Sequence, residues 1–269
     1  MLSVGLLGCG EIGRSILSTI AKSPIDGISI DVICCREKQE ETARNLFPNA
    51  KIVHSWSDYD GLTPDIVVEA AGQTAVVSLG PAILAAGSDL YLLSVGALAD
   101  KELHEKMLEA AKSGNSRIVI MSGALAGFDG LHSLRHSGLE SVVYRSTKPP
   151  KAWKGTLAES LIDLDKVNGP TVFFKANAAE AALQFPRNAN LAAAVALAGF
   201  GFEKTQVELV ADSNSSGNSG QIIASSKSAT LTLQLKGEGF AGNPKSSQIT
   251  GLSVVAALTS RVAPMFFAS

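Results

Sequence analysis

The sequence has no excess of charge of either sign. Its 269 residues include 23 lysines and arginines against 25 aspartates and glutamates, a formal net charge of −2. Without a basic cluster the chain offers no electrostatic footprint for nucleic acid or for an anionic membrane surface, so neither is expected as a partner. The longest apolar runs, such as 66–71 and 191–202, are too short or too rich in glycine and alanine to cross a bilayer, which requires about 20 residues.

Cysteine and histidine are also scarce. An odd count of three cysteines (Cys9, Cys34 and Cys35), two of them adjacent, fits neither a disulfide framework nor a four-ligand zinc site, so buried thiols are expected. His132 and His136 share a helix face at i, i+4, but no third ligand is evident and no metal site is predicted. The first residues lack the basic segment and cleavage site of a signal peptide, which favours a cytoplasmic location.

Up to about residue 124, short apolar segments alternate with longer amphipathic ones. This alternation predicts an α/β domain over 1–124, a Rossmann-type doubly wound parallel sheet with helices on both faces. The segments are, in chain order, 4–7, 12–22, 28–35, 38–46, 66–69, 82–86, 90–94, 100–112 and 118–121.

The pattern changes in the second half, where residues alternate between apolar and polar as in half-buried strands. Leu231, Leu233 and Leu235, for example, fall on one face. A second α+β domain with a mixed or antiparallel sheet is therefore predicted over 125–246. The serine-, asparagine- and glycine-rich stretch 213–220 reads as a long mobile loop, a candidate lid. The remaining expected segments are strands at 141–146, 171–175, 207–210 and 221–225 and helices at 190–199 and 251–262.

A glycine-rich turn follows the first strand directly. It reads Gly8-Cys9-Gly10-Glu11-Ile12-Gly13 and opens an amphipathic helix, the context in which such a turn binds a dinucleotide. Gly8 allows the tight turn, Gly10 lets backbone N–H groups approach a pyrophosphate, and Gly13 lets the helix pack closely on the strand. The cofactor site is expected at Gly8, Gly10, Glu11, Ile12 and Gly13, with phosphates at the positive end of the helix.

The end of the second strand leaves the phosphate state of the cofactor open. A carboxylate at this position binds the adenosine ribose of NAD, whereas a guanidinium accommodates the 2′-phosphate of NADP. The chain has both, in Cys35-Arg36-Glu37. The expected cofactor is therefore NAD or NADP, and Arg36 inclines the prediction toward use of both.

Several segments together resemble the L-aspartate dehydrogenase family, enzymes that oxidise the amine of aspartate with NAD(P) to iminosuccinate. The resemblance runs nearly from end to end and implies a homodimer built through the second domain, which also binds substrate. It further implies that a C-terminal helix, 247–269, packs back on the first domain. The matching segments are 8–13, 94–98, 122–124, 147–150, 185–193, 210–212, 218 and 243–247.

The resemblance also suggests site residues. It places Ala124 and Asn190 at positions that contact NAD, and Asn188 and Asn218 among the substrate contacts. A dicarboxylate needs fixed positive charge in a closed pocket. Lys148 and Lys245 are the expected partners of the substrate carboxylates, with Arg187 as a further candidate.

The chain departs from the family at the acid/base position. Where the family has an asparagine, one variable residue and the catalytic histidine, this chain reads Asn218-Ser219-Gly220. Loss of the imidazole removes a general base, typically worth 10²- to 10⁴-fold, and is expected to open space of that size in the pocket. Lys148, or a water held by Asn218 and Gln221, is the expected substitute.

Three functions remain open on these grounds. The first is an NAD(P)-dependent oxidoreductase acting on the C–N bond of a small amino acid, with aspartate as leading substrate. The second keeps fold and cofactor but reduces or oxidises a different imine or carbonyl compound, in keeping with Gly220. The third is a non-catalytic sensor of NAD(P).

Overall fold

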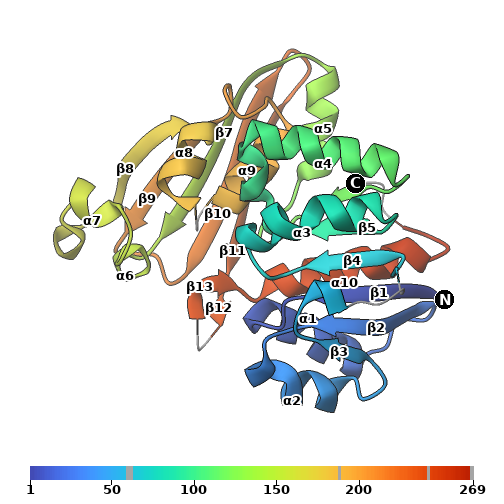
Figure 1. Cartoon of the computed structure of the whole chain (residues 1–269). Helices are drawn as coiled ribbons and strands as arrows, with labels where there is room; N and C mark the ends of the chain where they lie inside the picture. The colour runs from blue at the N-terminus through green and yellow to red at the C-terminus, as the bar shows by residue number, and fades with distance from the viewer. Residues whose placement is uncertain (59–62, 187–188, 241–242, 267–269) are drawn as a thin grey trace. The chain divides into compact units, whose positions relative to one another are not determined.

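The structure is a computed structural model that describes residues 1–58, 63–186, 189–240 and 243–266. The chain forms two compact units (Figure 1). The first joins Met1–Gly123 with the segment from Thr250 onward, and the second is Ala124–Ile249. None of the helices within the described ranges is long and apolar enough to cross a membrane.

The first unit is built on a six-stranded parallel sheet with the strand order β3-β2-β1-β4-β5-β6. The order reverses between β1 and β4, which is where dinucleotides bind in sheets of this kind. This confirms the predicted Rossmann-type fold. The strands are β1 (Leu2–Leu7), β2 (Ile28–Cys34), β3 (Lys51–Val53), β4 (Ile66–Glu69), β5 (Asp89–Leu92) and β6 (Ile118–Ile120).

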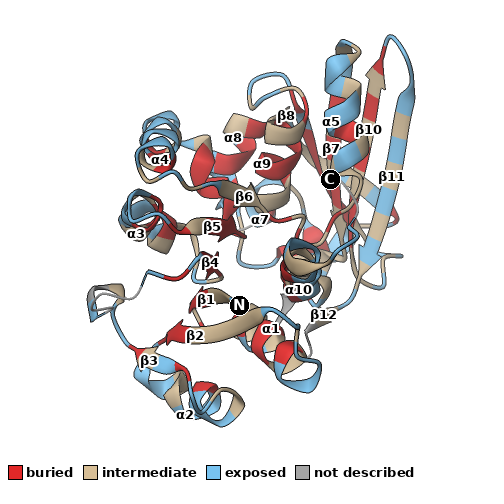
Figure 2. Ribbon diagram, turned by 90° about the vertical axis from the view of Figure 1, so that its right-hand side faces the viewer, coloured by how far each residue is buried: buried red, intermediate tan, exposed pale blue. Residues whose placement is uncertain are grey.

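Helices cover both faces of this sheet. Figure 2 shows α3 and α4 on the side opposite α1 and α10. Apolar residues of α1, α2 and α10, among them Leu17, Ala43 and Val254, pack in one core with strand residues such as Leu6 and Ile33. The elements are α1 (Glu11–Lys22), α2 (Glu37–Leu46), α3 (Gln73–Ala85), α4 (Lys101–Ser113) and α10 (Ile249–Val262), with 3-10 turns η1 (Trp56–Asp58) and η2 (Val95–Ala99).

The second unit contains a five-stranded mixed sheet with the order β11-β10-β7-β9-β8. Strand β7 lies at its centre, antiparallel to β10 and parallel to β9. The predicted mixed sheet is confirmed. Its strands are β7 (Leu139–Lys148), β8 (Pro170–Asn177), β9 (Gln206–Asp212), β10 (Asn218–Ser226) and β11 (Thr230–Gly237), and a separate hairpin is formed by β12 (Gly239–Phe240) and β13 (Asn243–Ser247).

The alternation of apolar and polar residues along the strands determines which face of the second sheet packs against helices. Val142 and Tyr144 of β7 and Ile222 of β10 point into a core with residues of α5, α8 and α9. Trp153, with none of its surface exposed, packs in the same core against Phe173. The helices are α5 (Phe128–His136), α6 (Pro150–Trp153), α7 (Ala158–Leu161), α8 (Ala178–Gln184) and α9 (Ala189–Ala198), with the 3-10 turn η3 (Leu164–Lys166).

The expectation of a loop over the whole of 213–220 is wrong. The stretch 213–220 is not a long mobile loop, because β10 already begins at Asn218 and pairs with β7. The short turn before it is held by hydrogen bonds, including Ser213 Oγ accepting from Gly169 N–H at 2.8 Å and Asp212 Oδ1 accepting from Asn214 N–H at 2.9 Å. The helix expected over 251–262 is confirmed, since α10 runs from Ile249 to Val262 within the C-terminal segment 247–269.

Candidate cofactor and substrate sites

Two glycines of the turn after β1 sit where a side chain has no room. Gly8 has a φ of +99°, and a Cβ there would lie 2.7 Å from the carbonyl oxygen of Ala70. A Cβ on Gly13 would run into the carbonyl oxygen of Gly8. Gly13 therefore lets α1 lie close to the end of β1, and Gly8 lets the turn after β1 lie close to the backbone after β4.

Gly10 differs, because no heavy atom lies within 4 Å of the position its Cβ would occupy. It is the N-cap of α1, and no side chain caps the helix there. The first N–H groups of the helix have no intrahelical partner and carry the positive end of the helix dipole. Open space before uncapped N–H donors fits a pyrophosphate, so Gly10, Glu11 and Ile12 are suited to hold the phosphates of NAD(P). The Glu11 carboxylate forms an ion pair with Arg14, which offsets its charge near that position.

The adenosine end of the site follows β2. Arg36 and Glu37 are both exposed, and neither forms an ion pair with another described residue. The Arg36 N–H donates to Gln39 Oε1 at 3.4 Å, which fixes the backbone at the start of α2. Both side chains that the sequence suggests for the ribose are thus exposed to a ligand.

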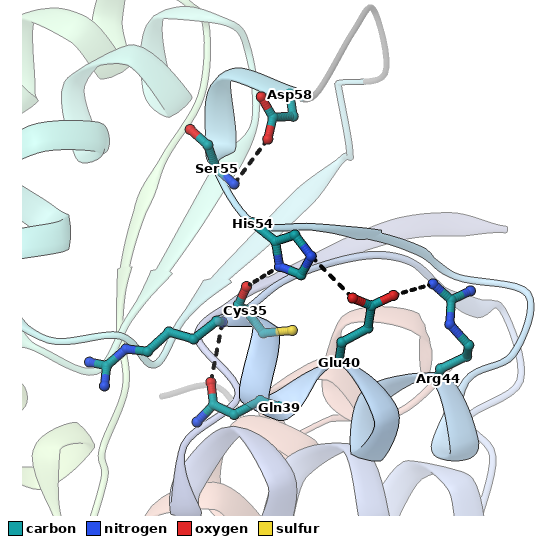
Figure 3. A network of polar contacts seen from close by, with 8 residues as sticks. Cys35, Gln39, Glu40, Arg44, His54, Ser55 and Asp58 are labelled. Carbon is teal, nitrogen blue, oxygen red and sulfur yellow. Dashed lines mark hydrogen bonds and ion pairs between the residues drawn. The ribbon is translucent and has the colours of Figure 1, made fainter.

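A polar network lies beside this loop (Figure 3). His54 Nδ1 is 3.0 Å from the Cys35 carbonyl oxygen, and His54 Nε2 is 3.1 Å from Glu40 Oε2. Glu40 also accepts from Arg44 at 2.6 Å. Hydrogen bonding to the Cys35 carbonyl raises the pKa of His54, and the Glu40 carboxylate raises it further.

Burial raises the pKa of Cys9 and of Cys34 to about 11, so these thiols stay protonated at neutral pH.

One buried residue near the reversal of strand order carries a role that the sequence does not predict. Glu69 ends β4 opposite Leu7 of β1 and is only 1% exposed. Its carboxylate accepts hydrogen bonds from the backbone of Ala71 and Gly72 and from Ser94. Ser94 opens the 94–98 segment that carried part of the family resemblance. A strand-ending glutamate gives no sequence signal of such a role.

In the second unit, β7 and β10 bring together two of the predicted substrate residues, Lys148 and Asn218. Ser219 pairs with Thr147, which places Asn218 and Lys148 side by side where β7 ends. By alternation, Lys148 lies on the same face of β7 as the buried Tyr144. Its Nζ is 5.0 Å from the centroid of the Trp153 ring. The indole N–H donates to the Val210 carbonyl oxygen at 3.0 Å, which fixes the ring under the lysine.

The space expected at Gly220 is filled. A Cβ on Gly220 would lie 3.0 Å from Leu125 Cδ1 and 3.5 Å from Tyr144 Cε2, and both side chains are buried. Tyr144 is hydrogen bonded to Ser146, and burial raises its pKa to about 12. Leu125 and Tyr144 therefore close the volume that the missing side chain was expected to leave open.

The proposed water held by Asn218 and Gln221 is also wrong. Successive strand residues point to opposite faces, so Gln221 faces away from Gly220 and Asn218. There it accepts a hydrogen bond from Arg145 Nη1 at 3.4 Å, within a group that includes the Arg145–Glu208 ion pair. Gln221 therefore belongs to the other side of the sheet.

Other predicted residues are placed only in part. Asn188 and Arg187 lie outside the described residues. The backbone of Lys245 belongs to β13, but its side chain lies outside the described part of the structure. Ala124 begins the second unit and lies in the turn that follows β6, and Asn190 lies in the first turn of α9.

Comparison with known proteins identifies both halves of the chain. Residues 8–121 match the model of the homoserine dehydrogenase NAD-binding domain, and residues 129–261 match the model of the aspartate dehydrogenase C-terminal domain. An L-aspartate dehydrogenase of Ralstonia pickettii is 39% identical over 265 residues, covering 97% of this chain and 98% of the relative. One from Serratia proteamaculans is 37% identical over 257 residues, covering 96% of each chain.

Solved structures agree on the fold. Aspartate dehydrogenase from Thermotoga maritima superposes with a TM-score of 0.78 at 24% identity and covers the whole of both chains. A hyperthermophilic archaeal homoserine dehydrogenase in complex with NADPH gives a TM-score of 0.57 at 14% identity, covering 97% of this chain and 98% of that one. The chain belongs to the L-aspartate dehydrogenase family and is an NAD(P)-dependent oxidoreductase of that type.

Proposed function

We propose that the protein oxidises the α-amine of L-aspartate to iminosuccinate with NAD or NADP. The observation that carries the proposal is the match to L-aspartate dehydrogenases over nearly the full length of both chains. The turn of Gly8, Gly10 and Gly13 supports it, because it leaves space and uncapped N–H donors where a pyrophosphate binds. Residues 1–124 then hold the dinucleotide and 125–246 the substrate.

The reaction needs a base as well as a hydride acceptor. When bound, the nicotinamide supplies the acceptor for the hydride that leaves the substrate Cα. The substrate ammonium must first lose a proton, so that the nitrogen lone pair can form the C=N bond. Lys148 is the proposed acceptor of this proton, because it lies beside Asn218 and close to Gly220 in the strand register. Asn218 is proposed to orient the substrate, and Lys245 to bind a carboxylate.

The other site residues are assigned on the same footing. Ala124 and Asn190 are proposed to contact the nicotinamide end, and Arg36 to bind the 2′-phosphate when NADP is used. Exposure of both Arg36 and Glu37 supports use of both cofactors. Asn188 remains a proposed substrate contact on the family resemblance alone.

The test is turnover followed by the absorbance of reduced nicotinamide. The protein is mixed with NAD or NADP and with aspartate, glutamate, alanine or malate, and in reverse with oxaloacetate and ammonia. Aspartate oxidation above all other substrates is expected. Lys148→Gln should lower kcat/KM for aspartate by about 10²- to 10⁴-fold, whereas Lys151→Gln, on the exposed surface of α6, should leave it unchanged. Equal rates in both variants would show that Lys148 is not the base.

A second candidate is favoured by the absence of an imidazole at Gly220. The same fold and cofactor would then serve a different imine or carbonyl compound whose reaction does not depend on a base at that position. Turnover of another substrate in the panel, with aspartate inert, supports this reading. Cofactor binding without turnover of any compound supports a sensor of NAD(P).

The protein is further proposed to act as a homodimer in the cytoplasm. The face of the second sheet away from the helices carries the paired half-buried residues Ile223 and Val143 beside the Arg145–Glu208 ion pair, a surface suited to a second copy. The three cysteines of the protein are free and buried, which fits a reducing compartment such as the cytoplasm. Sedimentation of the wild type and of Ile223→Glu tests the dimer.

A further inference from the structure

Glu69 occupies the point at which the strand order of the first sheet reverses. It is the last residue of β4 and pairs with Leu7, the last residue of β1. A dinucleotide bound across such a sheet extends over the carboxyl ends of these strands. The ends of β1 and β2 take the pyrophosphate and the adenosine ribose, so the nicotinamide riboside falls to the side of β4 and β5.

The Glu69 carboxylate ties together the two turns on that side. Its Oε1 accepts from Ala71 N–H at 2.8 Å and from Gly72 N–H at 2.7 Å, at the start of α3. Ser94 donates twice, from Oγ to Oε1 at 2.9 Å and from its N–H to Oε2 at 2.8 Å, where β5 leads into η2. One side chain thus fixes the backbone after both β4 and β5.

The same turn meets the phosphate-binding glycines. A Cβ on Gly8 would lie 2.7 Å from the Ala70 carbonyl oxygen and 2.8 Å from Ala71 Cα, so the two loops are in close contact. A shift of Ala71 would therefore reach Gly8 directly. By fixing Ala71 and Gly72, the hydrogen bonds of Glu69 thus also fix the position of the turn after β4 relative to the glycine turn after β1.

Within the part of the chain that the structure describes, no lysine, arginine or histidine forms an ion pair with Glu69. All four hydrogen-bonding groups are donors, and donors favour an ionised carboxylate. Burial raises the pKa of Glu69, and the hydrogen bonds from Gly72 and Ser94 act against that rise.

We propose that Glu69 is a positioning residue for the nicotinamide half of the dinucleotide and that its buried charge favours the oxidised, cationic ring over the reduced, neutral one. The proposal rests on the proposed use of NAD(P) at this site. A carboxylate in a medium of low polarity acts on a cation far more strongly than it would in water. The two parts of the proposal, position and charge, can be separated by substitution.

The experiment measures binding of NAD⁺ and of NADH, by calorimetry and by nucleotide fluorescence, at pH 9, well above the ordinary glutamate pKa of 4.5. Glu69→Gln keeps the shape and the Oε1 acceptor but removes the charge and the acceptor for Ser94 N–H. Ser94→Ala removes only the hydroxyl bond and keeps the charge. Because no aspartate is present, a wrong substrate assignment changes neither measurement.

Glu69→Gln is expected to weaken NAD⁺ binding roughly tenfold more than NADH binding. Ser94→Ala is expected to weaken both forms by the same factor, about two- to tenfold. If Glu69→Gln weakens NAD⁺ and NADH binding by the same factor, the charge effect is overturned. If Ser94→Ala binds both forms as tightly as the wild type does, the positioning role is overturned.

Should Glu69→Gln fail to fold, Glu69→Asp replaces it, since it keeps the charge on a shorter side chain. Weaker binding of both forms at an unchanged NAD⁺/NADH affinity ratio then supports the proposal. A changed ratio, or unchanged affinities, overturns it.

Discussion

The packing around Gly220 makes a quantitative prediction about restoring an imidazole. An added Cβ would lie 3.0 Å from Leu125 Cδ1 and 3.5 Å from Tyr144 Cε2, so an imidazole at this position is expected to crowd both side chains. Overpacking of this kind costs about 1–3 kcal/mol. At about 2–4 °C per kcal/mol for a protein of this size, Gly220→His alone should lower Tm by about 2–12 °C.

The gain in activity should appear only when Leu125 gives way. In Gly220→His/Leu125→Ala the ring can occupy the vacated volume, and kcat/KM for aspartate should rise about 10²-fold over Leu125→Ala. Leu125→Ala alone should lose about 2–5 kcal/mol of stability, part of which the histidine recovers. The coupling between the two substitutions is read from Tm values of the four proteins.

The matched control is Gly130→His in α5. A Cβ there meets only Leu231, at an ordinary 3.8 Å, so the variant adds an imidazole to the same unit without crowding. Gly130→His should shift Tm by no more than a few degrees and should leave kcat/KM for aspartate unchanged. If Gly220→His has the same Tm as the wild type, Leu125 does not restrict the size of the side chain at position 220. If the stable double variant gains no activity, an imidazole at position 220 does not reach the substrate amine, and Lys148 remains the proposed base.

Three further predictions concern the first unit. Gly10→Ala should fold normally, because the φ of −73° is ordinary and the space is open, yet weaken NAD(P) about 10- to 100-fold by blocking the pyrophosphate; calorimetry showing near wild-type affinity would contradict the assignment of this turn. Arg36→Ala should weaken NADP more than NAD, as should added salt; equal losses would exclude Arg36 as the reader of the 2′-phosphate. His54 should titrate in NMR above its ordinary pKa of 6.5, because the Cys35 carbonyl and then Glu40 accept from the protonated ring, and Glu40→Gln should lower that pKa. The stabilisation from these contacts is complete below pH 6.5 and lost as the pH rises through the folded-state pKa; an unchanged pKa in Glu40→Gln would exclude the ion pair.

The cofactor turn could be predicted because its signal is local. Gly8, Gly10 and Gly13 lie within six positions of one another, directly after an apolar strand, and their roles follow from backbone geometry alone. Helix α3 could be predicted only near its end, because it is apolar on all sides and carries Pro81, which reads as a helix breaker. Strand β3 has only three residues and too little pattern to detect.

Composition misled the prediction at 213–220 for a related reason. Serine, asparagine and glycine favour turns, but Ser219 and Gly220 extend a strand because Thr147 and Ser146, more than 70 positions earlier, offer backbone partners. The open space expected beside Gly220 also depends on residues that are distant in the sequence. A missing side chain in the sequence implies a vacancy only if no neighbour fills it, and Leu125 comes from a distant part of the chain.

Glu69 shows what a non-local hydrogen-bond network hides from the sequence. Locally, Ile-Val-Val-Glu reads as a buried strand ending in a solvated carboxylate. Two of its donor groups belong to Ser94, 25 positions away, and reach it only because β4 and β5 are neighbours in the sheet. A carboxylate buried there without these donors would cost several kcal/mol. Its burial therefore depends on loops whose positions it also fixes, so the carboxylate and the two turns are expected to order together when the first unit folds.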